Sequence, residues 1–163
     1  MKILGIDPGF AIAGYGVIEK RNGVLLPLDY GAITTPPSEN GAVRLAMLAE
    51  GLEKLIKVHK PDAVAVEELF FTHNAKTAIQ VAQARGVILL CAVRECGRIY
   101  EYTPLQIKQA LTGNGRAEKQ QIQYMVRVIL KLKEIPKPDD AADALAAAIC
   151  HANTTAYAER NVK

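Results

Sequence analysis

The stretch GIDPGFAIAGYGV, residues 5–17, decides the fold, because it contains the end of one predicted strand and the start of the next. The first of these strands is apolar but ends in a carboxylate instead of another core residue. Residues 2–7 read as a strand that ends at Asp7, and a Pro-Gly turn follows. Residues 14–19 and 24–34 read as the second and third strands, joined by a hairpin. Three strands in this order predict an antiparallel meander with Asp7 at one end of its first strand.

Strands and helices alternate along the remainder of the chain. Apolar residues recur at helical spacing between residues 45 and 56, and a short apolar strand follows. We expect helices up to residue 59, at 75–95, from 104, at 117–132 and from 138, and strands at 62–67 and 98–102. This order predicts an α/β fold in one domain, residues 1–163, with a five-stranded mixed sheet and helices on both faces. The sheet combines the antiparallel meander with two parallel strands.

Four carboxylates stand where an ordinary core offers no reason for them. Asp7 and Glu67 each end a strand, and Asp140 and Asp143 share one face of the last helix. If the two strands are neighbours, their carboxylates meet at the edge of the sheet where ligands bind in α/β folds. Like charges gathered there need a cation, and oxygen ligands alone suit Mg²⁺ or Mn²⁺. The pattern therefore predicts a metal site made by these four residues.

Each acid taken alone has an ordinary explanation. Asp7 before Pro-Gly is typical of a turn, and an aspartate at residues 139–140 is typical of a helix cap. Glu67 is harder to explain in this way, because Glu68 follows it and neither has an obvious turn or cap role. The joint pattern is what favours a functional site.

Basic residues are concentrated in one segment. Residues 1–107 carry 11 basic and 11 acidic side chains, whereas residues 108–137 carry seven basic and two acidic ones, a net charge of +5. Such a segment suggests a polyanionic partner, although a solvated helix face is an equally good interpretation of charge alone. The three cysteines form no CxxC motif and predict buried free thiols. No apolar stretch reaches the roughly 18 residues of a membrane span, so we expect a soluble cytoplasmic protein with no membrane contact.

Four motifs in the same order resemble the RuvC family of Holliday junction resolvases over nearly the whole chain. They are GIDPG at 5–9, VEELFF at 66–71, QARGV at 83–87 and DDAADALAAAI at 139–149. The resemblance implies a ribonuclease-H-like fold, a homodimer and Mg²⁺-dependent cleavage of four-way DNA junctions. It also implies cooperation with the RuvA–RuvB branch-migration proteins.

The resemblance assigns roles to individual residues. It implies that Asp7, Glu67, Asp140 and Asp143 are the catalytic, metal-binding acids, with Asp139 left as a helix cap or an alternative to Asp140. It implies DNA contacts for Lys108 and Lys119, and for Phe70 near the junction centre. Arg116 lies between the two lysines in the basic segment and is predicted to bind DNA as well. His73 close to the VE motif is taken as a surface residue that could approach the site.

The expected reaction is in-line hydrolysis of a phosphodiester. Two Mg²⁺ ions per active site, roughly 3.5–4 Å apart and replaceable by Mn²⁺, would activate water and stabilise the leaving oxygen. The products would carry 5′-phosphate and 3′-hydroxyl ends. Two symmetric nicks require a twofold enzyme, and small residues in the helix at 75–95, namely Ala78, Ala82 and Gly86, make this helix the candidate interface.

Three other functions are compatible with parts of the pattern. A ribonuclease-H-like nuclease acting on RNA or on non-junction DNA shares the acids. An actin-like ATP binder shares the glycine-rich hairpin, but it needs more than twice the ordinary domain length. A catalytically silent junction-binding module has no need for four carboxylates.

Overall fold

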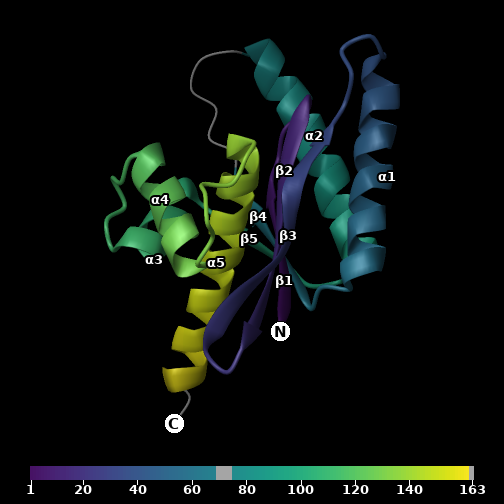
Figure 1. Cartoon of the computed structure of the whole chain (residues 1–163). Helices are drawn as coiled ribbons and strands as arrows, with labels where there is room; N and C mark the ends of the chain where they lie inside the picture. Colours follow the sequence, from purple (N-terminus) through teal and green to yellow (C-terminus); the bar gives the residue numbers. More distant parts are fainter. Residues whose placement is uncertain (69–74, 162–163) are drawn as a thin grey trace.

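A five-stranded mixed sheet with the order β3-β2-β1-β4-β5 forms the centre of the molecule (Figure 1). The computed structural model describes the backbone of residues 1–68 and 75–161, and the side chains of residues 1–68 and 77–155. The strands are β1 (Lys2–Asp7), β2 (Ile12–Arg21), β3 (Val24–Thr34), β4 (Ala63–Glu67) and β5 (Ile99–Tyr102). The first three strands pair antiparallel, β4 runs parallel to β1, and β5 runs parallel to β4. The predicted meander with two added parallel strands is confirmed.

Helices cover both faces of the sheet, as predicted (Figure 1). They are α1 (Gly41–His59), α2 (Ala75–Glu95), α3 (Pro104–Thr112), α4 (Lys119–Ile129) and α5 (Asp139–Asn161). α1 and α2 pack together on one face, and α5 lies on β1, β2 and β4 on the other. α3 and α4 pack against α5, so that this side of the molecule has a third layer.

Several element boundaries differ from those predicted from the sequence. β2 begins at Ile12 instead of residue 14, because Ile12 still pairs with Thr34 across the hairpin. α4 is shorter than the predicted 117–132 at both ends. The chain forms a turn before it, and Lys131 takes a left-handed conformation with φ of 53° after it. α5 extends through residues 153–155, for which the sequence pattern gave no reason.

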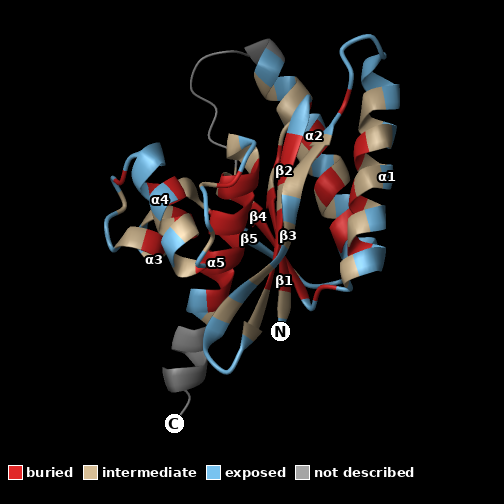
Figure 2. Ribbon diagram, in the orientation of Figure 1, coloured by how far each residue is buried: buried red, intermediate tan, exposed pale blue. Residues whose placement is uncertain are grey.

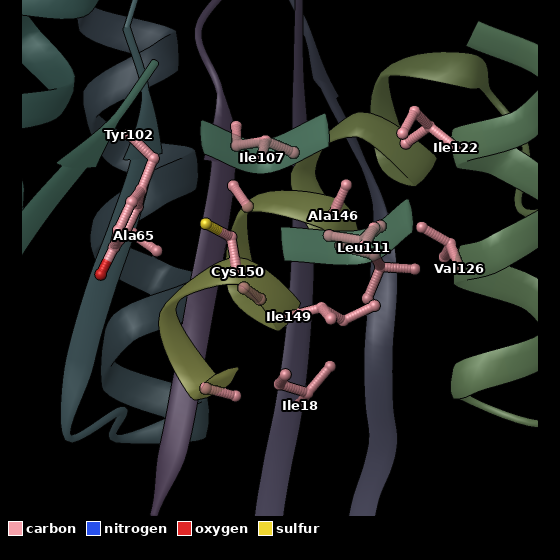
Figure 3. Close-up of a cluster of buried hydrophobic side chains, with 14 of the residues drawn as sticks. Ile18, Ala65, Tyr102, Ile107, Leu111, Ile122, Val126, Ala146, Ile149 and Cys150 are labelled. Atoms are coloured by element: carbon pink, nitrogen blue, oxygen red, sulfur yellow. The ribbon is translucent and has the colours of Figure 1, made fainter. Parts of the chain in front are cut away.

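The two faces of the sheet enclose two apolar cores. The core under α1 and α2 contains Leu4, Ile6 and Val64 of the strands, with Leu52 and Ile88 of the helices. The core on the other face joins the sheet to α3, α4 and α5, and Figure 3 shows its side chains reaching in from these elements. In Figure 2 the middle of α5 is buried all round, because it lies between the sheet on one side and α3 and α4 on the other.

Glycines in β1 and β2 allow α5 to lie very close to the sheet. A Cβ atom added to Gly5 would lie 1.9 Å from the carbonyl oxygen of Ala144, and one on Gly14 would lie 2.0 Å from that of Asp140. Both distances are far too short for a real side chain, so these two positions must be glycine in this arrangement. The glycine-rich stretch that opens the chain therefore fixes where the first turns of α5 lie.

Candidate active site

Two of the predicted acids end neighbouring strands of the sheet. Asp7 is the last residue of β1 and Glu67 the last of β4, and the parallel register pairs Ile6 with Val66 immediately before them. Both carboxyl groups are therefore at the same edge of the sheet, at the carboxyl ends of parallel strands. Asp7 points to the α5 face, the face that it shares with Ile3 and Gly5.

The first turns of α5 bring the other two acids to this edge. Asp7 pairs with Gly14 across the β1–β2 ladder, and the backbone of Asp140 lies directly over Gly14. Asp143 follows one turn later on the side of α5 that lines the cleft next to Asp7. The same close approach of helix and sheet that requires glycine at residue 14 therefore places α5's acids beside Asp7.

The first residue of α4 supplies a cation to this group of acids. Lys119 Nζ lies 2.9 Å from Asp143 Oδ2 and 3.9 Å from Asp139 Oδ2. The turn before it is held by the backbone N–H of Glu118, which donates to the side chain of Gln121 at 2.9 Å. Lys119 therefore connects the basic segment of the sequence to the acids.

These residues surround one cleft of about 420 Å³. Carboxylates line it from β1, β4 and α5, while α3 and α4 supply two lysines and part of the apolar wall. The residues that line it are Asp7, Glu67, Glu68, Pro104, Ile107, Lys108, Lys119, Ile122, Asp143 and Ala146. Three distant parts of the chain thus contribute acids to a single cleft, as the sequence pattern predicts.

Burial and mutual repulsion raise the pKa values of the two strand-end acids. The pKa of Asp7 rises to about 7, mainly through burial and then through the charges of Asp143 and Asp140. The pKa of Glu67 rises to about 8, again mainly through burial and then through Asp7 and Asp143. Lys119 opposes both shifts without cancelling them. The ionised forms of Asp7 and Glu67 are therefore unfavourable unless a further cation binds nearby.

Asp143 is in a different position, because it has a direct partner. Burial raises the pKa of its carboxyl group, and the hydrogen bond from Lys119 works against that increase. The same hydrogen bond raises the pKa of the Lys119 ammonium group. Asp143 and Lys119 thus stabilise each other's charged forms.

The donor chemistry of the cleft fits a hard divalent cation. The acids supply oxygen ligands only, and their pKa values are raised mainly by burial and then by neighbouring carboxylates, so a nearby cation would stabilise their charged forms. Among the described residues, however, no group of three or more acidic, histidine or cysteine side chains is arranged so that it could hold a metal ion. Lys119 hydrogen-bonds one oxygen of Asp143 in this arrangement, so its positive charge competes with that of a metal ion bound to the same carboxylate.

The other predicted site residues fall in different places. Lys108 lines the cleft from α3. Arg116 is exposed in the α3–α4 loop, where its backbone N–H donates to Asn114 Oδ1 at 3.0 Å, and it does not line the cleft. Phe70 and His73 lie outside the described residues.

Asp139 does not act as the cap that the sequence suggests. Its carboxylate accepts a hydrogen bond from Lys137 Nζ at 3.1 Å, and this contact lowers its pKa. Asp140 is half-buried at the start of α5 and acts on the pKa of Asp7 through its charge. Of these two acids, the charge of Asp140 therefore affects Asp7, while Asp139 pairs with lysines.

Glu68 lines the cleft but was not selected from the sequence. Its backbone N–H donates to the carbonyl of Tyr102 at 2.8 Å, which continues the β4–β5 pairing one residue beyond Glu67. The signal for it was the pair of consecutive acids at the end of an apolar strand. That signal was used for Glu67 alone.

The chain is similar to one family of known proteins over most of its length. The sequence pattern of the family described as crossover junction endodeoxyribonuclease RuvC matches residues 3–151. A protein of that name from Desulfitobacterium hafniense is 61% identical over 155 residues, 94% of this chain and 93% of its own length. Another from Caldanaerobacter subterraneus is 55% identical over 160 residues, 98% of this chain and 97% of its own.

A solved structure extends the likeness to three dimensions. Thermus thermophilus RuvC in complex with a Holliday junction substrate is 37% identical, covers 97% of this chain and 96% of its own, and superposes with a TM-score of 0.91. The fold is accordingly ribonuclease-H-like. With acids at the ends of β1 and β4 and at the start of α5, and with this degree of similarity, the chain belongs to the RuvC family of crossover junction endodeoxyribonucleases.

Proposed function

We propose that this protein cleaves four-way (Holliday) DNA junctions in recombination and repair, by paired symmetric nicks that leave 5′-phosphate and 3′-hydroxyl ends. The observation that carries the proposal is one cleft in which Asp7, Glu67 and Asp143 face Lys108 and Lys119. Acids on one wall and lysines on another suit a phosphodiester, which needs both metal ligands and cationic contacts. Family membership and the likeness to a junction-bound relative support four-way junctions as the substrate.

The acids would hold divalent cations, two per site, with Mg²⁺ as the expected metal and Mn²⁺ as a substitute. Asp7 ends β1, the central strand of the sheet, and would serve as the shared ligand, with Glu67 and Asp143 or Asp140 completing the set. The chemistry that such cations supply is activation of the attacking water and stabilisation of the leaving 3′ oxygen. The raised pKa values of Asp7 and Glu67 support this assignment, because both groups gain from a nearby positive charge.

The lysines would bind and orient the scissile phosphate. Lys119 is half-exposed at the mouth of the cleft, where it can leave Asp143 for a phosphate oxygen. Lys108 faces the same cleft from α3, and Arg116 is exposed on the loop between the two lysines. Phe70 stays the predicted contact near the junction centre.

A homodimer would place two such clefts on one junction, and the exposed side of α2 is the proposed interface. Ile79, Leu90 and Val93 are 62%, 47% and 52% exposed, and Ala82 and Gly86 lie between them at the spacing of a coiled-coil seam. By length and composition the stretch Thr77–Glu95 could also span a bilayer, which is weak evidence because other apolar helices satisfy the same test. We propose that this surface meets α2 of a second copy instead of lipid.

The remaining context follows from family membership. We propose that the whole chain works as one catalytic domain in the cytoplasm and acts on junctions handled by the RuvA–RuvB branch-migration proteins. The match over residues 3–151 supports this assignment.

The direct test is cleavage of a four-way junction by Asp7→Asn. We expect cleavage to fall by about 1,000-fold or more, because a metal ligand is lost, while binding of the junction in Ca²⁺ or EDTA persists. Asp62→Asn, at a surface carboxylate, is the matched control. Cleavage by Asp140→Asn and by Asp139→Asn, measured side by side, tells which of the two neighbouring acids is needed as a metal ligand.

Substrate choice is tested with the wild-type protein on three substrates. They are a four-way junction, a linear duplex of the same sequence and an RNA/DNA hybrid. Paired symmetric nicks confined to the junction support the proposal. Preferred cleavage of the hybrid or of the duplex would show that the family fold serves another nuclease activity here.

A further inference from the structure

The turn that follows Asp7 is held from the opposite side of the sheet. Asp7 faces α5, whereas Phe10, three residues later, packs in the apolar core under α1. We infer that Arg44 of α1 is a positioning residue for the candidate active site, because it holds the turn that fixes where β1 ends and where the Asp7 carboxylate lies. The inference rests on the proposed use of Asp7 as a metal ligand.

Arg44 makes three contacts with this region. Its Nε donates to Thr35 Oγ1 at 2.9 Å, its terminal nitrogen donates to the Thr35 carbonyl at 3.3 Å, and its guanidinium carbon lies 4.3 Å from the centre of the Phe10 ring. Within residues 1–68 and 77–155, Arg44 takes part in no ion pair. Its planar guanidinium group therefore donates its hydrogen bonds to Thr35, next to the turn, and not to a carboxylate.

Thr35 connects Arg44 to the turn itself. It is 5% exposed, its hydroxyl donates to the carbonyl of Phe10 at 2.7 Å, and its backbone N–H donates to the carbonyl of Ala11 at 2.9 Å. The hydroxyl thus donates to the turn while it accepts from Arg44, an arrangement in which each hydrogen bond strengthens the other. Two consecutive carbonyls of the turn are fixed by one buried residue.

The geometry of the turn shows why it needs such support. A Cβ atom on Gly9 would lie 1.9 Å from the carbonyl oxygen of Ile12, so the chain folds back tightly here. Asp7 and Gly14 form the last pair of the β1–β2 ladder before the turn. The terminal pair of a ladder is the first to open when the adjoining turn loosens. Opening this pair would move the Asp7 carboxylate relative to Glu67 and Asp143.

The experiment compares Arg44→Ala and Thr35→Val with three matched controls. Arg44→Lys keeps the charge without the fork, Thr35→Ser keeps the hydroxyl, and Lys54→Ala removes an exposed positive charge from the same helix. Junction cleavage is measured as a function of Mg²⁺ concentration, well below the melting temperature of each variant. Junction affinity and amide hydrogen exchange of residues 8–15 are measured without Mg²⁺.

We expect Arg44→Ala and Thr35→Val to need about 10- to 100-fold more Mg²⁺ or to cleave more slowly by that factor, which is the usual effect of losing support behind a metal ligand. Hydrogen exchange should become faster in residues 8–15, and junction affinity should not change. Thr35→Ser and Lys54→Ala should match the wild type, and Arg44→Lys should lie between.

A purely structural role predicts a different result. In that case both variants melt at lower temperature but keep the wild-type Mg²⁺ dependence and the wild-type hydrogen exchange of the turn, and the inference is overturned. Failure of the proposed function is distinguishable, because then either the wild-type protein does not cleave junctions or Asp7→Asn cleaves them as fast as the wild type. Hydrogen exchange of the turn can be read whether or not the protein cleaves junctions.

Discussion

The two faces of the sheet are covered by helices in different ways. On one face α5 brings small side chains, most of them alanine, against glycines of β1 and β2, so helix and sheet backbones nearly touch. On the other face α1 and α2 fill the space with large side chains such as Leu48, Leu52 and Ile88. The acids and the cleft belong to the α5 face, whereas the exposed apolar stripe of α2 belongs to the other.

The difference places the proposed active site and the proposed dimer interface on opposite faces of one sheet. Close backbone packing leaves little freedom for α5 and so fixes the positions of Asp140 and Asp143 relative to Asp7. The close approach of α5 therefore explains the glycines on one face, and the apolar surface on the other is the one we propose for a second copy.

The largest expected effect is on the tightly packed face. Gly5→Ala places a Cβ atom 1.9 Å from the Ala144 carbonyl, and we expect a loss of about 3 kcal/mol or more in the free energy of unfolding. Gly41→Ala is the matched control, because its Cβ would meet the Phe10 ring at an ordinary 3.9 Å. Urea unfolding measures both. Equal stability of the two variants would show that α5 can move away from the sheet at little cost.

A charge in the apolar stripe tests the other face. Leu90→Glu would bury two symmetry-related charges in the proposed α2–α2 interface, and we expect the dimer to dissociate about 100-fold more readily. Sedimentation or light scattering over a range of concentrations measures the change. Val58→Glu, on the exposed side of α1, is the control and should leave the oligomeric state unchanged. A dimer that survives Leu90→Glu would place the interface elsewhere.

Removing the lysine from the cleft should affect cleavage and metal binding in opposite directions. Lys119→Met loses a phosphate contact, and we expect cleavage to fall about 10- to 100-fold. Metal binding without DNA should become tighter, because Asp143 loses the ammonium group 2.9 Å away. Lys137→Met is the control, since Lys137 pairs with Asp139 and not with Asp143. Calorimetry with Mn²⁺ and no DNA measures the affinity for the metal. Weaker Mn²⁺ binding by Lys119→Met would contradict the idea that Lys119 competes with the metal for Asp143.

The smallest expected effect is the pH dependence of stability in the metal-free protein. The folded pKa values of Asp7 and Glu67, about 7 and about 8, lie above the ordinary 3.8 and 4.5, so the folded state binds more protons than the unfolded state between pH 4 and 8. The free energy of unfolding should therefore fall as pH rises through this window. Asp7→Asn should flatten the decrease, and Glu50→Gln should not. An identical slope in Asp7→Asn and the wild type would mean that Asp7 is not the source.

Much of this arrangement could be predicted from residue patterns. Alternation in β1 and β4 placed Asp7 and Glu67 at strand ends, and the three-residue spacing of Asp140 and Asp143 placed both on one helix face. These are local regularities of strands and helices, so the sequence alone contains them. That the four acids are catalytic stays a prediction, which the variants above test.

Other features depend on contacts between distant segments and could not be predicted. Lys119 was found through its charge and the family motif, but its pairing with Asp143 depends on how α4 packs against α5. The Arg44–Thr35–Phe10 network joins residues with no common motif. The true start of α4 depends on a turn closed by the backbone hydrogen bond from Ala117 to Asn114.

The order of the acids along the chain also has a consequence for biosynthesis. Asp7 ends β1, the first strand in chain order, whereas the helix that carries Asp140 and Asp143 and covers Gly5 is the last element and begins at residue 139. A nascent chain on the ribosome therefore holds two acids without the helix that completes the cleft. If the four acids act as proposed, a nascent chain in which α5 has not yet been made lacks two of them and is not expected to cleave DNA.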